Sequence, residues 1–127
     1  MKKKTDPRHT ARVEAVKKLF SEVFFSQNPN KVSLPGKILE KNKQIEQIIA
    51  QNAPAWPIEQ IAPIDMAVLK LAIYELIFKE KKEPYKVVID EAVEIAKEYG
   101  ADSSPSFVNG VLGSVVKNKI DSERNQN

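Results

Sequence analysis

Residues 64–81 read IDMAVLKLAIYELIFKEK, and this stretch decides the fold. In a helix, its apolar side chains would cover most of the circumference rather than a single stripe. A helix of that kind belongs in the middle of a bundle. The apolar part is too short for a membrane span and is interrupted by Lys70 and Glu75. The stretch therefore predicts the most buried helix of an all-α protein.

Apolar residues at helical spacing predict further helices on both sides of this stretch. The first covers 7–26 and ends at Asn28-Pro29. After a loose stretch to Pro35 and Gly36, one helix runs to about Asn52. Three prolines leave room for only a short helical piece at 57–61, with Trp56 as its anchor. Helix 85–99 follows Pro84 and stops at Gly100 as the residue after its C-cap. The last helix starts at Ser104-Pro105, an N-cap followed by proline.

The sequence thus predicts a compact all-α bundle of five or six helices. We expect a single domain over 1–127, with a basic flexible tail at 1–6 and a polar, frayed tail at 121–127. Gly110 and Gly113 lie inside the last helix and each costs about 1 kcal/mol relative to alanine. Close approach of another helix is the expected compensation. Asn109 is expected to form a buried hydrogen bond between helices.

The charge of the chain is unevenly distributed. Residues 1–37 hold nine Lys and Arg against three acids, which gives +6, and residues 38–127 hold eleven against fourteen, which gives −3. Such asymmetry indicates an anionic partner at one end of the molecule, or else a basic tail that only improves solubility. We expect a cytoplasmic protein, since no apolar stretch follows the basic N-terminus.

The sequence lacks the usual signs of catalysis. It has no cysteine and one histidine, so neither a disulfide nor a metal site is expected. It contains no phosphate-binding glycine loop and no nucleophile elbow, and we expect no cofactor. Asp90 and Glu91 point about 100° apart on a helix, which suits one solvated acid and one that bonds between helices. The sequence predicts a protein that is not an enzyme.

Three segments resemble the NusB family of transcription antitermination factors. They are IDMAVLKLAIYEL at 64–76, PYKVVIDEAVEIAK at 84–97 and FVNGVL at 107–112, in family order and with family-like gaps. ARVEAVKKLF at 11–20 resembles the first family helix more weakly. The resemblance implies two packed three-helix sub-bundles. Family members place two helices between the first helix and Trp56, where this sequence predicts one, so we expect a shortened N-terminal half.

The resemblance also implies a function in transcription termination and its regulation. The protein would bind single-stranded boxA-type RNA together with the ribosomal protein NusE, within the RNA polymerase antitermination complex and notably on ribosomal RNA operons. Two alternatives remain open. One is a helical protein–protein adaptor without RNA binding. The other is an RNA-recognition module like those of ribosomal RNA methyltransferases. The sequence argues against this second alternative, since it ends soon after the sixth helix.

The predicted RNA contacts lie at the start of the chain and in the last helix. The set is Lys2, Lys3, Lys4, Arg8, His9, Arg12 and Phe107. Arg12 is expected to project its guanidinium into a groove beside the first helix, or alternatively to pair with an acid of a neighbouring helix. Alanine at Arg8 and Arg12 is expected to leave the fold intact. Phe107 would stack on a base, although helical spacing alone favours a place in the core.

The resemblance assigns contact with NusE to the central helix and the helix that follows. The residues at those positions are Asp65, Tyr74, Glu75 and Tyr85. Tyr74 has the core as its alternative location.

Overall fold

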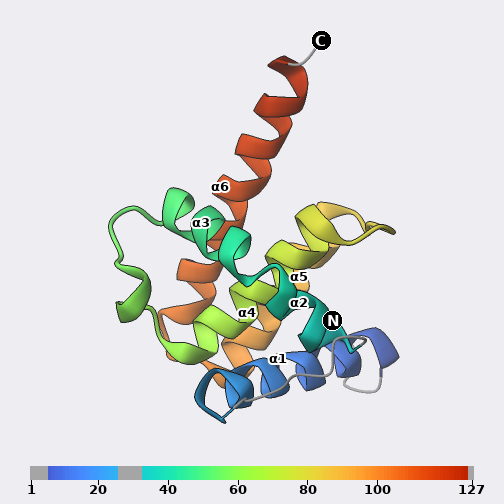
Figure 1. Ribbon diagram of the computed structural model, residues 1–127, viewed down its shortest axis with the longest axis vertical. Helices are drawn as coiled ribbons and strands as arrows, with labels where there is room; N and C mark the ends of the chain where they lie inside the picture. Colours follow the sequence, from blue (N-terminus) through green and yellow to red (C-terminus); the bar gives the residue numbers. More distant parts are fainter. Residues whose placement is uncertain (1–5, 26–32, 126–127) are drawn as a thin grey trace.

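Helix α4 (Pro63–Ile73) lies in the middle of the bundle shown in Figure 1. The computed structural model describes residues 6–25 and 33–125, without the side chains of 22–25 and 125. The other α-helices are α1 (Pro7–Phe25), α2 (Leu34–Glu40), α3 (Asn42–Asn52), α5 (Tyr85–Tyr99) and α6 (Ser104–Asn125). Every residue from Asp65 to Ile73 is buried, and all five of these helices contact α4. The predicted all-α bundle with a central helix is confirmed.

The central helix continues beyond Ile73 as a π-helical turn, η2 (Tyr74–Phe78). The Lys79 N–H donates to the carbonyl of Tyr74, five residues earlier, at 2.9 Å. Lys79 is extended, so the helix ends three residues before the predicted Lys81. Residues 79–83 are all charged and have no apolar side chain to bury against the bundle. They form the connection to α5 instead.

Two charged side chains of the central helix are buried and paired. Lys70 is 4% exposed, and its Nζ lies 3.2 Å from Oε2 of Glu46 on α3. Glu75 is 5% exposed and pairs with Arg12 of α1. Because an unpaired charge in such a place is costly, these two pairs fix which neighbours the central helix accepts.

Two helices, not one, lie between α1 and Trp56. Helix α2 begins with a cap in which Ser33 Oγ accepts from the Gly36 N–H at 3.1 Å. It stops at Lys41, and α3 begins at Asn42. The sequence did not predict this break at Lys41, because the apolar residues keep a helical spacing across it. The expected loss of one helix is therefore wrong, while the short piece predicted at 57–61 is present as the 3₁₀ turn η1 (Ile58–Gln60).

Helix α5 has the predicted bounds, but Gly100 ends it for a different reason than predicted. Its backbone is extended rather than left-handed. A Cβ at this position would lie 2.5 Å from Ser104 Oγ and 2.7 Å from the Ala96 carbonyl oxygen. Ser104 Oγ meanwhile accepts from the Ala101 N–H at 2.9 Å. Glycine is needed here because the turn into α6 leaves no space for a side chain.

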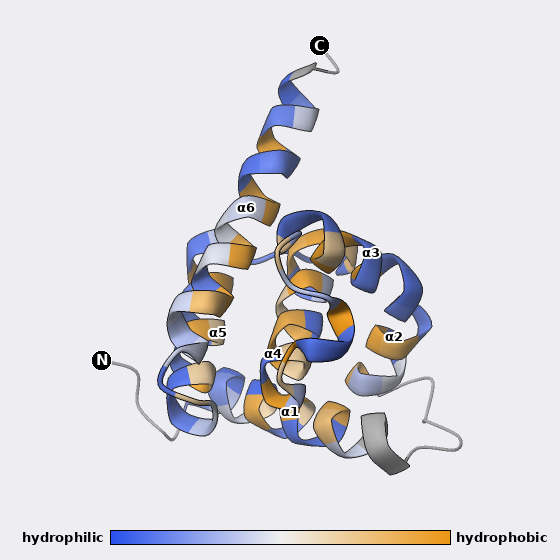
Figure 2. Cartoon of the chain, turned by 90° about the vertical axis from the view of Figure 1, so that its left-hand side faces the viewer, coloured by the Kyte–Doolittle hydropathy of each residue, from blue (hydrophilic) through white to orange (hydrophobic). Residues whose placement is uncertain are grey.

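Three expectations for α6 are wrong. Gly110 and Gly113 are exposed, and a Cβ on either would meet no atom within 4 Å among the described residues. Asn109 is exposed rather than buried. The helix also continues to Asn125 instead of fraying at Asp121. Its end projects from the bundle and is mostly hydrophilic in Figure 2. A polar helix surface in solvent needs no second helix against it.

Polar bonds attach the middle of α6 to α3. Ser114 Oγ donates to Asn52 Oδ1 at 2.6 Å, and Asn118 Nδ2 donates to the same oxygen at 2.8 Å.

In the described part of the chain, no helix combines the length and the apolar character that a membrane crossing requires.

Candidate functional site

Helix α1 is attached to the bundle by a largely buried group of titratable side chains, called the ion-pair cluster here. Its members are His9, Arg12, Glu75, Glu83 and Glu91. They come from α1, from η2, from the charged connection and from α5. The cluster joins the N-terminal helix to the C-terminal half of the chain.

Arg12 is the centre of the ion-pair cluster. Its Nε donates to Glu75 Oε2 at 2.9 Å and its Nη2 to Oε1 at 2.8 Å, which is a bidentate pair. Nη2 also bonds Glu83, and Nη1 lies 3.8 Å from Glu91 Oε1. Burial acts to lower the pKa of Arg12, but the bonds and charges of Glu75 and Glu83 raise it overall. The arginine is therefore a permanent cation inside the protein.

Arg12 adopts the second of its two predicted arrangements, a pair with an acid of a neighbouring element. The side chain is 7% exposed and pairs with acids of neighbouring elements rather than projecting into a groove. Glu75, predicted for the protein partner, forms the other half of that pair. The expectation that the fold tolerates alanine at Arg12 is wrong, because the substitution would leave the buried Glu75 carboxylate without its cation.

His9 is buried as well, at 8% exposure. Its Nδ1 lies 2.8 Å from Glu91 Oε2, and its Nε2 lies 3.9 Å from Glu98 Oε2. Asp90 is exposed and Glu91 buried, as the sequence predicts for this pair. Although acids gather around His9, no set of three or more His, Asp or Glu side chains in 6–25 and 33–125 is arranged to hold a metal ion.

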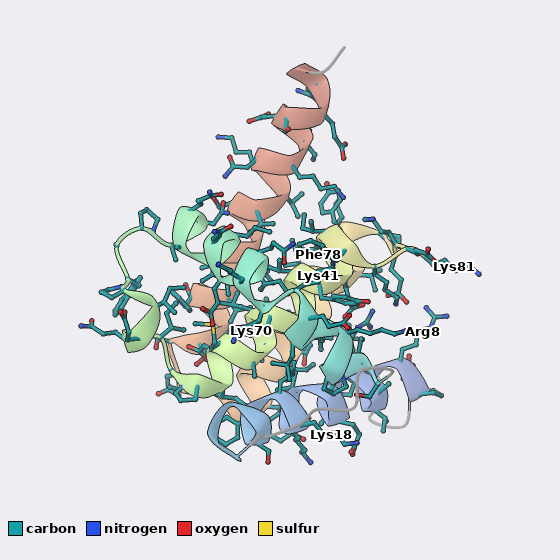
Figure 3. The ribbon with its side chains drawn as sticks, in the orientation of Figure 1. Arg8, Lys18, Lys41, Lys70, Phe78 and Lys81 are labelled. Atoms are coloured by element: carbon teal, nitrogen blue, oxygen red, sulfur yellow. The ribbon has the colours of Figure 1, made fainter. Side chains whose placement is uncertain are left out.

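Arg8 has a different environment, one turn before Arg12. Its side chain is 74% exposed and extends away from the bundle in Figure 3. Its Nη1 lies 3.9 Å from Glu83 Oε1. Lys2, Lys3 and Lys4 lie outside the described residues. Among the predicted N-terminal contacts that the structure describes, Arg8 is the one that faces solvent.

A hollow of about 200 Å³ lies where the start of α6 meets the connection before α4. We call it the aromatic hollow. Its lining residues are Trp56, Gln60, Ile61, Ala62, Asp65, Ser103 and Phe107. Trp56 is 52% exposed, and its ring meets the ring of Phe107 edge-on at 6.1 Å between centroids. The two rings form a partly open apolar surface of the kind that receives another ring.

Phe107 combines its two predicted locations. It is half-buried and packs against the core, yet it also lines the aromatic hollow. Asp65 lies in the same hollow, 7% exposed, and its Oδ1 finds no hydrogen-bond partner among the described residues. A buried acceptor with an unmet bond at the wall of a hollow suits a donor from a ligand.

The four residues predicted for the protein partner do not share one patch. Asp65 lines the aromatic hollow, and Glu75 belongs to the ion-pair cluster. Tyr74 is half-buried and lines a groove beside α2. Tyr85 is 44% exposed at the first position of α5. Sequence reasoning missed Trp56 as a site residue, although a lone tryptophan in a proline-rich connection was a signal for it.

These features define a small all-helical protein with a closed polar cluster, an open aromatic hollow and a basic N-terminal segment. The model of the NusB family matches residues 32–117, more than half of the chain. Transcription antitermination protein NusB of Roseiflexus castenholzii is 51% identical over 78 residues, which cover 61% of this chain and 55% of that protein. The same-named protein of Clostridium novyi is 44% identical over 80 residues, 62% and 59% of the two chains.

Solved structures match over a larger share of the chain. T. maritima NusB is 33% identical with a TM-score of 0.76, covering 88% of this chain and 92% of that one. A chain of the structure described as "Crystal Structure of a Plectonemic RNA Supercoil" is 26% identical with a TM-score of 0.78, covering 89% and 96%. The chain belongs to the NusB family. Its sequence matches span only about half the length of the first curated relatives.

Proposed function

We propose that this chain is a non-catalytic RNA-binding antitermination factor, which binds boxA-type single-stranded RNA together with NusE. The observation that carries the proposal is the family match joined to a fold that agrees with T. maritima NusB over 88% of the chain. The description of a second similar structure names an RNA. The +6 charge on residues 1–37 supplies the attraction that an RNA backbone needs.

Two places divide the work of RNA binding in this proposal. Arg8, with the three lysines before it in the sequence, attracts phosphates by charge. The aromatic hollow provides ring faces, on which an unpaired base stacks. Arg12 and His9 act indirectly, because their buried contacts hold α1, and with it Arg8, in position.

Asp65 and Tyr85 remain the proposed contacts for NusE. The unmet bond of Asp65 Oδ1 gives a protein donor a reason to bind there. The exposed ring of Tyr85, at the start of α5, provides apolar area of the kind that interfaces use, as a separate point of contact. We expect a one-to-one complex, in which this chain and NusE elute together at micromolar concentration. Asp65→Ala should weaken that complex without loss of stability, since it removes a buried acceptor that has no partner.

RNA binding is tested by fluorescence anisotropy with a boxA-like strand, with and without NusE. The variant Lys2→Gln/Lys3→Gln/Lys4→Gln/Arg8→Gln should lower affinity and reduce the slope of log affinity against log salt by up to about 2.8, at about 0.7 per phosphate. A control with equal charge change replaces four exposed lysines with glutamine: Lys43, Lys86, Lys97 and Lys117. If both variants bind like the parent, RNA binding through this end is wrong.

The adaptor alternative has one observation in its favour. His9 and Arg12, two of the predicted RNA contacts, are engaged inside the protein. In that case NusE would bind and RNA of any sequence would not. Co-elution with NusE in the absence of any anisotropy change with RNA would favour the adaptor.

A further inference from the structure

A basic groove lies between α2 and the π-helical turn η2, and it shares no lining residue with the aromatic hollow. It encloses about 540 Å³, within the range of about 300–1,000 Å³ common for ligand sites. Four lysines line it: Lys37, Lys41, Lys79 and Lys81. Glu40 and Glu80 are the acids on its wall, so the positive charges exceed the negative ones by two. The groove favours an anionic occupant.

Two aromatic rings belong to the same groove. Tyr74 and Phe78 are both half-buried and pack against the core, so their positions are fixed. Lys41 Nζ lies 5.6 Å from the centroid of the Phe78 ring, and Figure 3 labels this pair. An ammonium over that ring shows that one ring face is accessible to a group of this size. The groove thus combines cations with ring faces, the two elements of a single-strand site.

The charged connection that supplies Lys79 and Lys81 to the groove also approaches the exposed start of α1. Lys81 is two residues from Glu83, whose Oε1 lies 3.9 Å from Arg8 Nη1. In Figure 3 the side chains of Lys81 and Arg8 extend at the same edge of the molecule. A strand held at Arg8 would therefore reach the groove through the charged connection 79–83.

We propose that this groove binds the continuation of the single-stranded RNA, with its phosphates on the lysines and a base over Phe78. A base that stacks on this ring takes the place of the Lys41 ammonium, which then becomes available to a phosphate. This inference rests on the proposed function, because it needs a strand already held at the basic N-terminal segment.

The test compares two RNA probes on the full chain. One is a boxA-like core of about eight nucleotides, and the other carries about eight added uridines at one end, with both ends tried. The groove variant is Lys37→Gln/Lys41→Gln/Lys79→Gln/Lys81→Gln. The control is the glutamine variant at Lys43, Lys86, Lys97 and Lys117, all exposed and absent from the lining of the groove. Thermal melts check that both variants fold.

We expect the parent to bind the extended strand more tightly than the core. The groove variant should lose that gain and keep the affinity for the core, and its salt slope for the extended strand should fall by up to about 2.8. Phe78→Leu should weaken only the extended strand, by about 5-fold to 150-fold, the equivalent of one stacked base. The control should behave like the parent.

Three outcomes would overturn the proposal. Equal losses in the groove variant and the control would show a general charge effect. An extension that adds nothing to the parent's affinity would show that the strand does not reach the groove. If a polyglutamate peptide displaced the extended strand as strongly as free oligouridine does, the groove would be a site for acidic protein rather than for RNA. Failure of the proposed function itself is distinct, since the unaltered chain would then fail to bind the core RNA.

Discussion

The ion-pair cluster and the aromatic hollow carry the same sequence prediction but have opposite surroundings. Arg12 and His9 are buried against carboxylates of other elements. Phe107 is half-buried and lines a hollow beside the exposed Trp56. In both cases the prediction of an RNA contact came from the type of residue and from its place near the start of a helix. The difference teaches that a predicted contact is decided by partners across the bundle, which the local pattern of one helix does not show.

The largest expected effect comes from breaking the ion-pair cluster. Arg12→Ala should lower the free energy of unfolding by about 3–5 kcal/mol, because it leaves Glu75 charged and buried without its cation. Urea unfolding at neutral pH measures the loss.

Arg8→Ala is the matched control for Arg12→Ala, one turn away on the same helix. Its side chain is 74% exposed, and its Nη1 lies 3.9 Å from Glu83 Oε1, at the limit of an ion pair. We expect a change within about 0.5 kcal/mol. Equal losses in the two variants would contradict the assignment of Arg12 to the closed cluster.

Substitutions in the aromatic hollow should lower RNA affinity and leave its dependence on salt unchanged. Trp56→Ala should weaken binding of a boxA-like strand by about 5-fold to 150-fold, equivalent to about 1–3 kcal/mol of stacking, with an unchanged salt slope. Phe107→Ala should have a similar effect on binding but a larger effect on stability, since Phe107 also packs against the core. Anisotropy titrations at several salt concentrations check the first statement and thermal melts the second. A reduced salt slope in Trp56→Ala would contradict a stacking role.

Substitutions at two glycines of the C-terminal half should have smaller effects on stability. They test the space available for a side chain rather than the ion pairs. Gly110→Ala should raise the free energy of unfolding by about 1 kcal/mol, because the position is helical and open. Gly100→Ala should lower it, since its Cβ would lie 2.7 Å from the Ala96 carbonyl oxygen. Urea unfolding of both variants measures the two signs. A loss in Gly110→Ala would mean that α6 packs against something at this face.

The fold was largely predictable because its main signals are local. Apolar spacing located α1, α4, α5 and α6, and the bounds of α5 were predicted to the residue. The break at Lys41 was missed because the apolar spacing runs through it without a proline or glycine. The exposed glycines of α6 were misread, since the sequence does not show which helix faces remain uncovered.

The site was less predictable, because it depends on contacts between distant segments. Arg12 and Glu75 are 63 residues apart in the chain, and Trp56 and Phe107 are 51 apart. The acids near Arg12 belong to η2, to the charged connection and to α5, whose relative positions follow only from the packed bundle. The groove at Lys41 arises in the same way, from α2 and η2.

The smallest expected effect is a pH dependence confined to the ion-pair cluster. Burial acts to raise the pKa of Glu83, but the hydrogen bond and charge of Arg12 outweigh it, so the pKa falls below its ordinary 4.5. A carboxyl whose pKa is lower in the folded state stabilises that state above its unfolded pKa. This stabilisation is lost as the pH falls through the folded-state pKa. Arg12 stays charged throughout, so the loss reports on the carboxylate.

Glu83→Gln should therefore be less stable than the parent at pH 7, and the difference should narrow below about pH 4.5. The difference should be modest, since the side chain of Glu83 is 23% exposed and partly screened by solvent. Glu80→Gln, an exposed position in the same connection, is the control and should show no such narrowing. Unfolding free energies from urea at pH 7, 5, 4 and 3 give the comparison. A difference that stays constant over this range would mean that Glu83 contributes through packing alone, and the ion-pair cluster would then extend only to Glu75 and Glu91.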